Sequence, residues 1–206
     1  MTDASPLPTA LVLLDYFGIA VFAVSGALLA AEKKQTLVTF IFFAVITGVG
    51  GGTLRDLLIG APVFWVHSNA MLLICIAAAL IVWLTSRRRF AGRALLWFDA
   101  AGITAYATYG AAKALAYGLA PVPAFAMGVM TACVGGIIRD VLAGEPSILM
   151  RPELYVTAAA LSAGLFVGLA LAGLVPWLAA LVAVVAGFAL RAAAISRGWS
   201  LPQYRD

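Results

Sequence analysis

Long apolar stretches, separated by short polar segments, run along almost the whole chain. They occupy residues 11–30, 37–59, 69–85, 95–115, 122–143, 154–173 and 176–194. About 20 mostly apolar residues in an α-helix span the hydrocarbon core of a bilayer. The pattern therefore predicts an all-α integral membrane protein, with seven transmembrane helices in a single transmembrane domain over residues 1–206.

The composition argues against a soluble protein. The 206 residues are 64% hydrophobic and 11% charged, whereas a soluble domain is about half apolar and a quarter charged. The segments between the apolar stretches are too short to form a soluble domain. The net charge of +4 comes from short loops rather than from one polar face, which argues against nucleic-acid binding.

Apart from Arg55, Lys113 and Arg139, which lie inside the predicted spans, basic residues are confined to alternate loops. One face of the predicted bundle holds ten of them, namely Lys33, Lys34, Arg87, Arg88, Arg89, Arg93, Arg151, Arg191, Arg197 and Arg205. The loops of the other face contain no Lys or Arg. By the positive-inside rule, the N-terminus is expected outside and the C-terminus in the cytoplasm. We interpret the run 87–89 as a topology signal, with anionic-lipid binding at the cytoplasmic face as the alternative.

The two halves of the chain match at a constant offset of 84 residues. Ten identities at glycine, proline or polar positions share this offset: Asp15 with Asp99, Gly18 with Gly102, Gly26 with Gly110, Thr47 with Thr131, Gly51 with Gly135, Gly52 with Gly136, Arg55 with Arg139, Asp56 with Asp140, Gly60 with Gly144 and Pro62 with Pro146. Three spans per unit predict an inverted 3+3 repeat, about 11–85 and about 95–173, plus one extra helix at about 176–194. Transporters built this way hold their sites near the midplane.

Glycines gather within the second and fifth spans. The candidate positions are Gly48, Gly50, Gly51, Gly52, Gly135 and Gly136. Because glycine costs about 1 kcal/mol relative to alanine inside a helix, these clusters favour a kink or an unwound turn that lines a wet cavity. Close helix packing is the alternative. We favour the pathway interpretation, because both clusters precede an Arg-Asp dipeptide.

The dipeptides Arg55-Asp56 and Arg139-Asp140 lie inside apolar stretches. A charge at the bilayer centre costs at least about 2.5 kcal/mol, so these side chains are expected to face a water-filled cavity and to gate it. Static ion pairs that fix the fold are the alternative. Neighbouring helical positions point about 100° apart, so Arg55 is not expected to bridge well to Asp56. The aspartate or the arginine is expected to pair with another helix, or with carbonyls freed by the glycine break, in two constrictions roughly 15 Å apart along the membrane normal.

Five further polar residues are weaker candidates. Lys113 ends the fourth span and is expected to join the gating charges or to extend toward the outer interface. Asp15 and Asp99 lie near the starts of their spans, where helix capping and a pathway role are equally compatible with the sequence. Ser25 and Tyr109 occupy equivalent positions in the two halves, which predicts packing hydrogen bonds.

No catalytic or metal site is expected. Cys75 and Cys133 fall in apolar stretches and are interpreted as small buried hydrophobes, and the one histidine, His67, lies in a loop. The spans contain no Ser/His pair or metal-ligand spacing. We therefore expect no enzyme activity and no cofactor, only permeant potassium or sodium ions.

The motifs GVGGGTLRD at 48–56 and GGIIRDVLAGEP at 135–146 resemble those of the bacterial branch of the trimeric intracellular cation channel family. The resemblance also covers the seven spans and their 3+3+1 layout. It implies a homotrimer in a bacterial inner (plasma) membrane, with a pore in each subunit lined by the kinked second and fifth helices. It also implies subunit contacts through the first and fourth helices. The Lys-Glu-Val motif of the animal members, tied to phosphoinositide binding, is replaced here by residues 53–56, Thr-Leu-Arg-Asp.

These observations favour a channel for monovalent cations, chiefly potassium. The alternative is a secondary transporter for glycine or a similar small zwitterion, since bacterial sequences of this type are also described as glycine transporters. An inverted repeat with interrupted helices suits alternating access. In that case an arginine would bind the carboxylate of the substrate and an aspartate its amine.

Overall fold

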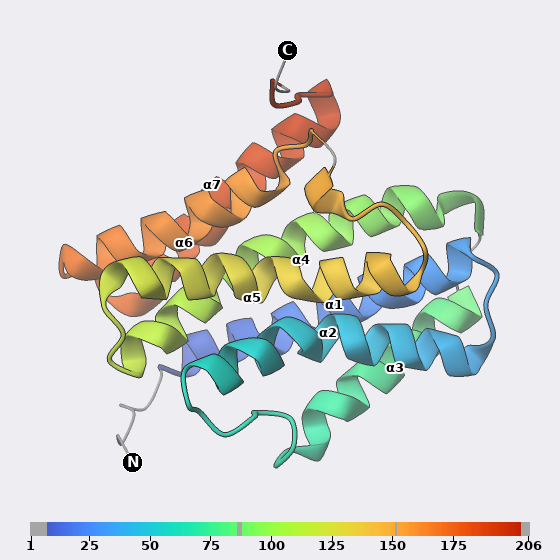
Figure 1. The fold of residues 1–206 in the computed structure, drawn as a ribbon, viewed down its shortest axis with the longest axis horizontal. Helices are drawn as coiled ribbons and strands as arrows, with labels where there is room; N and C mark the ends of the chain where they lie inside the picture. The colour runs from blue at the N-terminus through green and yellow to red at the C-terminus, as the bar shows by residue number, and fades with distance from the viewer. Residues whose placement is uncertain (1–7, 86–87, 151, 203–206) are drawn as a thin grey trace.

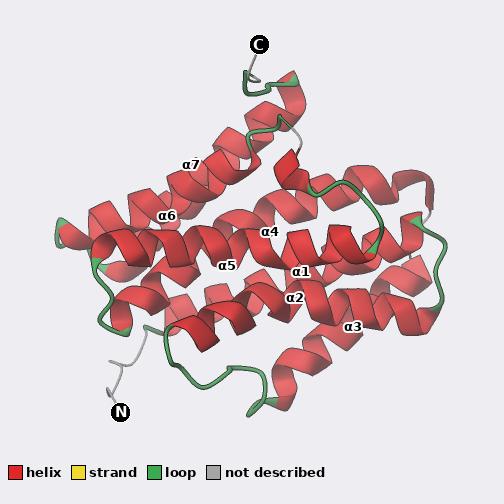
Figure 2. Ribbon diagram, viewed as in Figure 1, coloured by secondary structure: helices red, strands yellow, loops and turns green. Residues whose placement is uncertain are grey.

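The computed structural model describes residues 8–85, 88–150 and 152–202. Its helices are α1 (Thr9–Glu32), α2 (Leu37–Leu58), α3 (Asn69–Thr85), α4 (Arg88–Ala116), α5 (Pro121–Leu142), the short 3₁₀ helix η1 (Ile148–Met150), α6 (Tyr155–Leu171) and α7 (Pro176–Arg197). Loops connect them, and the described residues contain no strand (Figure 2). The predicted all-α fold with seven long helices is confirmed.

The helix lengths suit a membrane protein. Among the described residues, α1, α2, α5 and α7 are each long and apolar enough to cross a membrane, and α3 and α6 are apolar helices of 17 residues. The fourth helix begins at Arg88, seven residues before the predicted start, because polar residues continue the helix beyond its apolar stretch. Its apolar part nevertheless matches the predicted span.

The helices pack in two matching groups around a central pair. α1 and α4 cross at the centre, α2 and α3 pack on α1, and α5 and α6 pack on α4 (Figure 1). α2 and α5 also contact each other, and α7 lies against α6 and α4. The contacts of the first three helices therefore recur in the next three.

Glycines allow α1 and α4 to cross closely. A Cβ added to Gly18 would lie 2.2 Å from the Tyr106 ring, and one added to Gly102 would lie 2.8 Å from the Phe22 ring. The two rings are themselves offset by 84 residues and contact each other, with centroids 5.2 Å apart. The same arrangement thus occurs on both sides of the crossing.

The glycines of α2 and α5 bring two backbones into contact. A Cβ on Gly51 would lie 2.0 Å from the Thr131 carbonyl oxygen, and one on Gly135 would lie 2.5 Å from the Thr47 carbonyl oxygen. Both helices remain α-helical through these glycines. The predicted unwound turn is therefore wrong: the missing side chains permit close helix packing, and the helical hydrogen bonds are kept.

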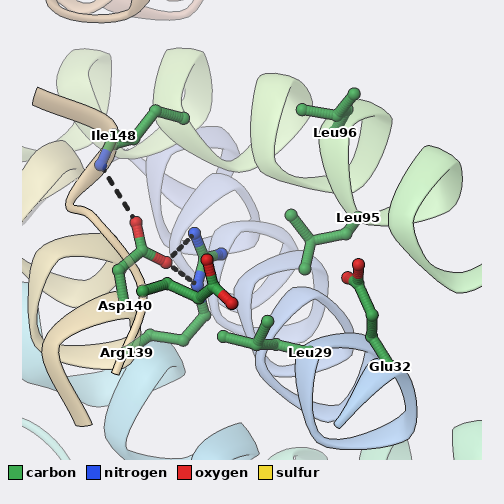
Figure 3. Close-up of a pocket in the computed structure, with 8 residues that line it drawn as sticks. Leu29, Glu32, Leu95, Leu96, Arg139, Asp140 and Ile148 are labelled. Atoms are coloured by element: carbon green, nitrogen blue, oxygen red, sulfur yellow. Dashed lines mark hydrogen bonds and ion pairs between the residues drawn. The ribbon is translucent and has the colours of Figure 1, made fainter. Parts of the chain in front are cut away.

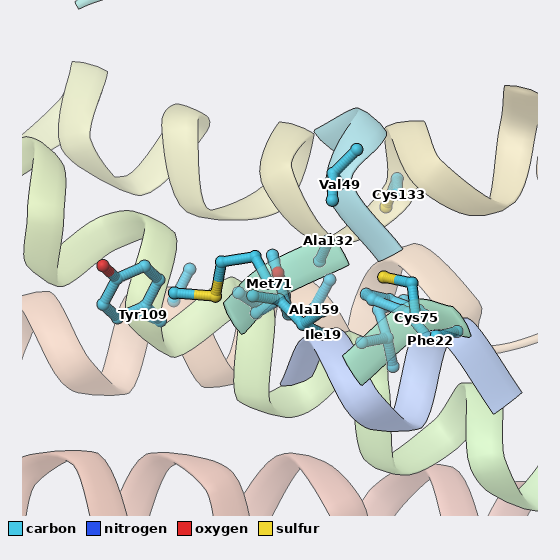
Figure 4. Packing of buried hydrophobic residues seen from close by; sticks show 14 of the residues in the cluster. Ile19, Phe22, Val49, Met71, Cys75, Tyr109, Ala132, Cys133 and Ala159 are labelled. Atoms are coloured by element: carbon cyan, nitrogen blue, oxygen red, sulfur yellow. The ribbon is translucent and has the colours of Figure 1, made fainter. Parts of the chain in front are cut away.

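The core of the bundle is apolar and close-packed. Figure 4 shows Phe22, Val49, Met71 and both cysteines within it. Cys75 and Cys133 are buried and form no disulfide, which agrees with their interpretation as small hydrophobes.

The central position of α4 limits its role in assembly. None of its residues from Asp99 to Ala116 is exposed, whereas Leu13 and Phe17 on α1 are. The expectation that α4 forms a main subunit contact is therefore wrong for this part of the helix, because the subunit's own helices cover it.

The α2–α5 contact leads to a stability prediction. We expect Gly51→Ala to lower the free energy of unfolding by about 1–3 kcal/mol, because the new methyl group meets backbone atoms that cannot move aside alone. Gly168→Ala on α6 is the matched control, because no atom lies within 4 Å of its added Cβ. Thermal unfolding in detergent measures both. Equal midpoints for Gly51→Ala and Gly168→Ala would contradict the close packing.

Candidate functional site

Two clusters of buried charge lie near the C-terminal ends of α2 and α5. The first cluster comprises Arg55, Asp56 and Lys113, and the second comprises Arg139, Asp140, Asp99 and Ser25. In both, the arginine is 1% exposed. Such charges need partners inside an apolar bundle, and the structure supplies them.

In the first cluster, Arg55 pairs with its own neighbour. Its Nε and Nη2 atoms lie 2.9 and 2.7 Å from Oδ1 of Asp56. The expectation that adjacent positions cannot pair is wrong, because the long arginine side chain curls back along the helix and reaches the carboxylate. The expected partner on another helix is present for Asp56, which also pairs with Lys113 of α4.

Lys113 reaches into the first cluster from α4. Its Nζ atom lies 2.8 Å from Oδ1 of Asp56, and the residue is 7% exposed. The expected extension toward the outer interface is therefore wrong. A buried carboxylate attracts an ammonium group strongly where little water competes, so Asp56 pairs with two cations from two helices.

In the second cluster, Arg139 binds three partners. Nε and Nη2 lie 2.9 and 2.8 Å from Oδ1 of Asp140, and Nη1 lies 2.8 Å from Oδ1 of Asp99 on α4. Nη1 also donates to the Ser25 hydroxyl on α1. The cluster thus joins α1, α4 and α5.

Both aspartates also hold the loop that follows their helix. The backbone N–H of Phe64 donates to Oδ2 of Asp56 at 3.1 Å, and that of Ile148 donates to Oδ2 of Asp140 at 3.1 Å. The matched glycines at 60 and 144 adopt φ of 68°, which ends each helix. The spacing of Asp, Gly and Pro in both motifs is the sequence signal for this loop, and the sequence interpretation did not use it.

Asp15 and Asp99 are not helix caps. They lie within α1 and α4 and are 4% and 1% exposed. Asp99 binds Arg139 and accepts a hydrogen bond from Ser25 at 3.4 Å, while Asp15 lies near Arg55 and Tyr109. The Tyr109 ring also lies 5.1 Å from the guanidinium carbon of Arg55. The four secondary candidates therefore gather around the two arginines.

Besides Ser25 and Tyr109, the clusters differ at a second matched position. Lys113 of the first cluster corresponds to Leu29, which is 84 residues earlier. Leu29 lines a cavity of ≈ 180 Å³ that reaches the second cluster (Figure 3), together with Glu32, Leu95, Leu96, Arg139, Asp140, Glu145 and Ile148. A water molecule occupies about 30 Å³ in the liquid, so the cavity has room for several.

Two polar contacts escaped the sequence interpretation. The Tyr106 hydroxyl donates to the Gly48 carbonyl at 3.1 Å, at the centre of the bundle. Arg191, expected among the cytoplasmic loop residues, is instead buried and pairs with Glu153 at 2.5 Å. Of the other predicted basic residues, Arg87, Arg151 and Arg205 lie outside the described residues, as do the side chains of Arg88, Arg89 and Arg93.

The charged candidate residues of both clusters are arranged as ion pairs. Within the described ranges, no three His, Cys, Asp or Glu residues gather as a metal site. What the structure brings together is two ion-pair clusters on the helices that carry the glycine motifs, one of them beside a polar cavity.

The first cluster leads to a second prediction. Asp56→Asn leaves Arg55 and Lys113 without their shared carboxylate, so we expect it to destabilise the protein by about 3–5 kcal/mol. Adding Lys113→Met should recover part of that loss, because one uncompensated cation is removed. Thermal unfolding in detergent measures both, with Glu32→Gln, an exposed carboxylate, as the control. If Asp56→Asn unfolds like Glu32→Gln, the carboxylate does not stabilise the cluster.

The fold matches solved structures closely. The trimeric intracellular cation channel (TRIC) orthologue from Rhodobacter sphaeroides superposes with a TM-score of 0.88 and 43% sequence identity, covering 93% of this chain and 100% of that one. A prokaryotic TRIC channel crystallised in 0.5 M KCl superposes with a TM-score of 0.84 and 29% identity, covering 94% and 99%.

Sequence relatives give the same result. The UPF0126 membrane protein of Vibrio cholerae is 42% identical over 198 residues, which cover 94% of this chain and 82% of the relative. The UPF0126 inner membrane protein YadS of Escherichia coli K12 is 40% identical over 148 residues, which cover 70% and 72%. The family model described as "Glycine transporter" matches twice, at residues 12–87 and 96–172. The chain therefore belongs to this family of membrane proteins, and its fold is similar to those of solved TRIC cation channels.

Proposed function

We propose that the protein is a channel for monovalent cations, chiefly potassium, in a bacterial inner membrane. The observation that carries the proposal is the pair of buried charge clusters at opposite ends of the bundle, one of them reached by a polar cavity. The solved relatives, described as cation channels, support it. Each subunit would hold its own pathway, bordered by α1, α2, α4 and α5.

The clusters are suited to act as two gates in series. In each cluster an arginine pairs with the aspartate that follows it on the same helix. A residue of α4 completes the cluster: Lys113 binds Asp56 in the first, and Asp99 binds Arg139 in the second. An ion can pass only if these groups move apart or exchange partners. The arginines then control access by charge, and the bundle described here corresponds to a closed state.

The charges around the cavity favour cations over anions. Asp99 and Asp140 face a single cation, Arg139, in the second cluster. At the cavity, Glu32 and Glu145 add two carboxylates, and Lys33 pairs with Glu145. A cavity lined with excess negative charge concentrates cations and repels anions.

The centre of the bundle would also have to rearrange. Phe22 and Tyr106 contact each other across the α1–α4 crossing, and Tyr106 is hydrogen-bonded to Gly48. The backbones of α2 and α5 touch beside it. Opening would therefore require small shifts of α1 against α4, since α2 and α5 are in backbone contact at Gly51 and Gly135.

We further propose a homotrimer with its N-terminus outside and its C-terminus in the cytoplasm. The trimeric description of the R. sphaeroides orthologue supports the assembly. The basic residues of the loops support the orientation. In this orientation the second cluster and its cavity face the cytoplasm, and anionic lipids there would meet Lys34 and Arg197, which are exposed.

Glycine transport is the competing function, and the geometry makes it less favourable. The substrate carboxylate would need a free guanidinium, but Arg139 is bound by Asp99, Asp140 and Ser25. A zwitterion would have to displace at least one of them.

A liposome assay separates the two functions. We expect purified protein to release rubidium, used as a potassium tracer, at a rate that rises linearly with ion concentration, with no uptake of labelled glycine. Arg139→Ala should change the rubidium rate at equal protein abundance, because it removes the cation that holds the second cluster. Saturable glycine counterflow without rubidium flux would identify a transporter instead, and an unchanged rate in Arg139→Ala would remove the gating role.

A further inference from the structure

Arg191 on α7 is buried beside the loop that precedes α6. Its Nη2 atom donates to Oε2 of Glu153 at 2.5 Å. Its guanidinium carbon lies 5.6 Å from the centre of the Tyr155 ring. α7, which lies outside the repeat, therefore contacts Glu153 and Tyr155 at the start of α6.

The segment after α7 holds the same loop. Ser200 forms an antiparallel bridge with Glu153, and the backbone N–H of Leu201 donates to the Pro152 carbonyl at 2.7 Å. Together with Arg191, these contacts fix residues 152–155 against the C-terminal end of α7.

Tyr155 carries this contact to the second cluster. It is 1% exposed, and its hydroxyl oxygen lies 2.9 Å from the position of a Cβ built on Gly136. The same position is 3.7 Å from Nη2 of Arg139 and 3.8 Å from Oδ1 of Asp99. The hydroxyl, which has no hydrogen-bond partner of its own among the described residues, and the Arg139–Asp99 ion pair therefore border the same space, which the glycine leaves open.

Among the described residues, no corresponding contact from α7 reaches the first cluster. The positions matching Glu153 and Tyr155 are Asn69 and Met71, and α7 has no counterpart in the first half. At Gly52, which matches Gly136, the ring of Phe64 fills the space instead. The contact from α7 is thus specific to the second cluster.

We propose that Arg191 is a positioning residue for the second cluster. Through Glu153 it holds Tyr155 against the Arg139–Asp99 pair and keeps that pair in its closed arrangement. Release of the Arg191–Glu153 pair frees Tyr155 to move and lets the second cluster open, while the first cluster is unaffected. This inference rests on the proposed channel function, which it extends to α7.

The native cysteines allow a test that does not depend on ion flow. Cys133 is one helical turn before Gly136 on α5 and is 5% exposed, whereas Cys75 on α3 is 0% exposed. In detergent-purified protein with either Cys75→Ala or Cys133→Ala, the labelling rate of the remaining thiol by a small methanethiosulfonate can be followed by intact mass. We expect Glu153→Gln and Arg191→Met each to raise the Cys133 rate about fivefold, which corresponds to a coupling of about 1 kcal/mol, with Cys75 unchanged.

The double variant distinguishes a specific pair from general loosening. If the two residues act only through each other, Glu153→Gln with Arg191→Met raises Cys133 labelling no more than either change alone. In planar bilayers the same variants should raise open probability at unchanged single-channel conductance. Gly168→Ala on α6, outside both the cavity and this contact, is the control.

The proposal would be overturned if Glu153→Gln left the Cys133 labelling rate in Cys75→Ala protein unchanged. It would also be overturned if Glu153→Gln raised the Cys75 labelling rate in Cys133→Ala protein by the same factor. Should Arg191→Met fail to fold, Glu153→Gln alone decides, because it is isosteric and its side chain is 30% exposed. Absence of current from the wild type would remove the channel function, while the labelling result would still decide the role of Arg191.

Discussion

Each Arg-Asp dipeptide brings a cation and its counter-charge into an apolar bundle, and the geometry of that pair determines what surrounds it. One oxygen of the aspartate binds the arginine, and the other binds a backbone N–H eight residues later. The helix end, the loop after it and the charge are therefore one unit. A residue of α4, Lys113 or Asp99, completes each unit, because a lone buried charge would be strongly unfavourable.

The glycines serve the same arrangement by a different physical means. At Gly51 and Gly135 they let α2 and α5 touch through their backbones, and at Gly18 and Gly102 they receive aromatic rings from the opposite half. The helices are therefore in close contact at the centre of the bundle, and the charged side chains lie toward its ends. A pathway along the bundle would have to pass both charge clusters.

The repeat is not fully symmetric, and its differences give the two ends different properties. Lys113 fills the first cluster, whereas its counterpart Leu29 lines a cavity that reaches the second. The last helix, α7, adds a contact to the second cluster alone. Each cluster thus has a contact that the other lacks. The first has an additional cation, Lys113, and the second has a contact from α7, which has no counterpart in the first half. Opening of the two ends need not respond to the same stimulus.

Much of the fold could be predicted from the sequence, because span length and repeat offset are local properties of the chain. The third helix was placed at its observed bounds, and the glycine and Arg-Asp positions do converge. Side-chain partners could not be predicted. Whether Arg55 pairs with Asp56, and whether Lys113 reaches Asp56, depends on side-chain packing. The directions of the Cβ atoms on a helix do not define that packing. The sequence predicts a possible helix cap at Asp99 because the apolar stretch begins near it, whereas α4 starts at Arg88. Arg191 is predicted as a loop charge because it lies near the end of the last apolar stretch, whereas α7 continues to Arg197.

The central claim is that these clusters gate a cation pathway within one subunit, and the reversal potential tests it most directly. Purified wild-type protein in a planar bilayer, with a tenfold gradient of potassium chloride, should show discrete current steps that reverse near the potassium equilibrium potential. Reversal near the chloride potential, or a smooth leak without unitary steps, would contradict the account.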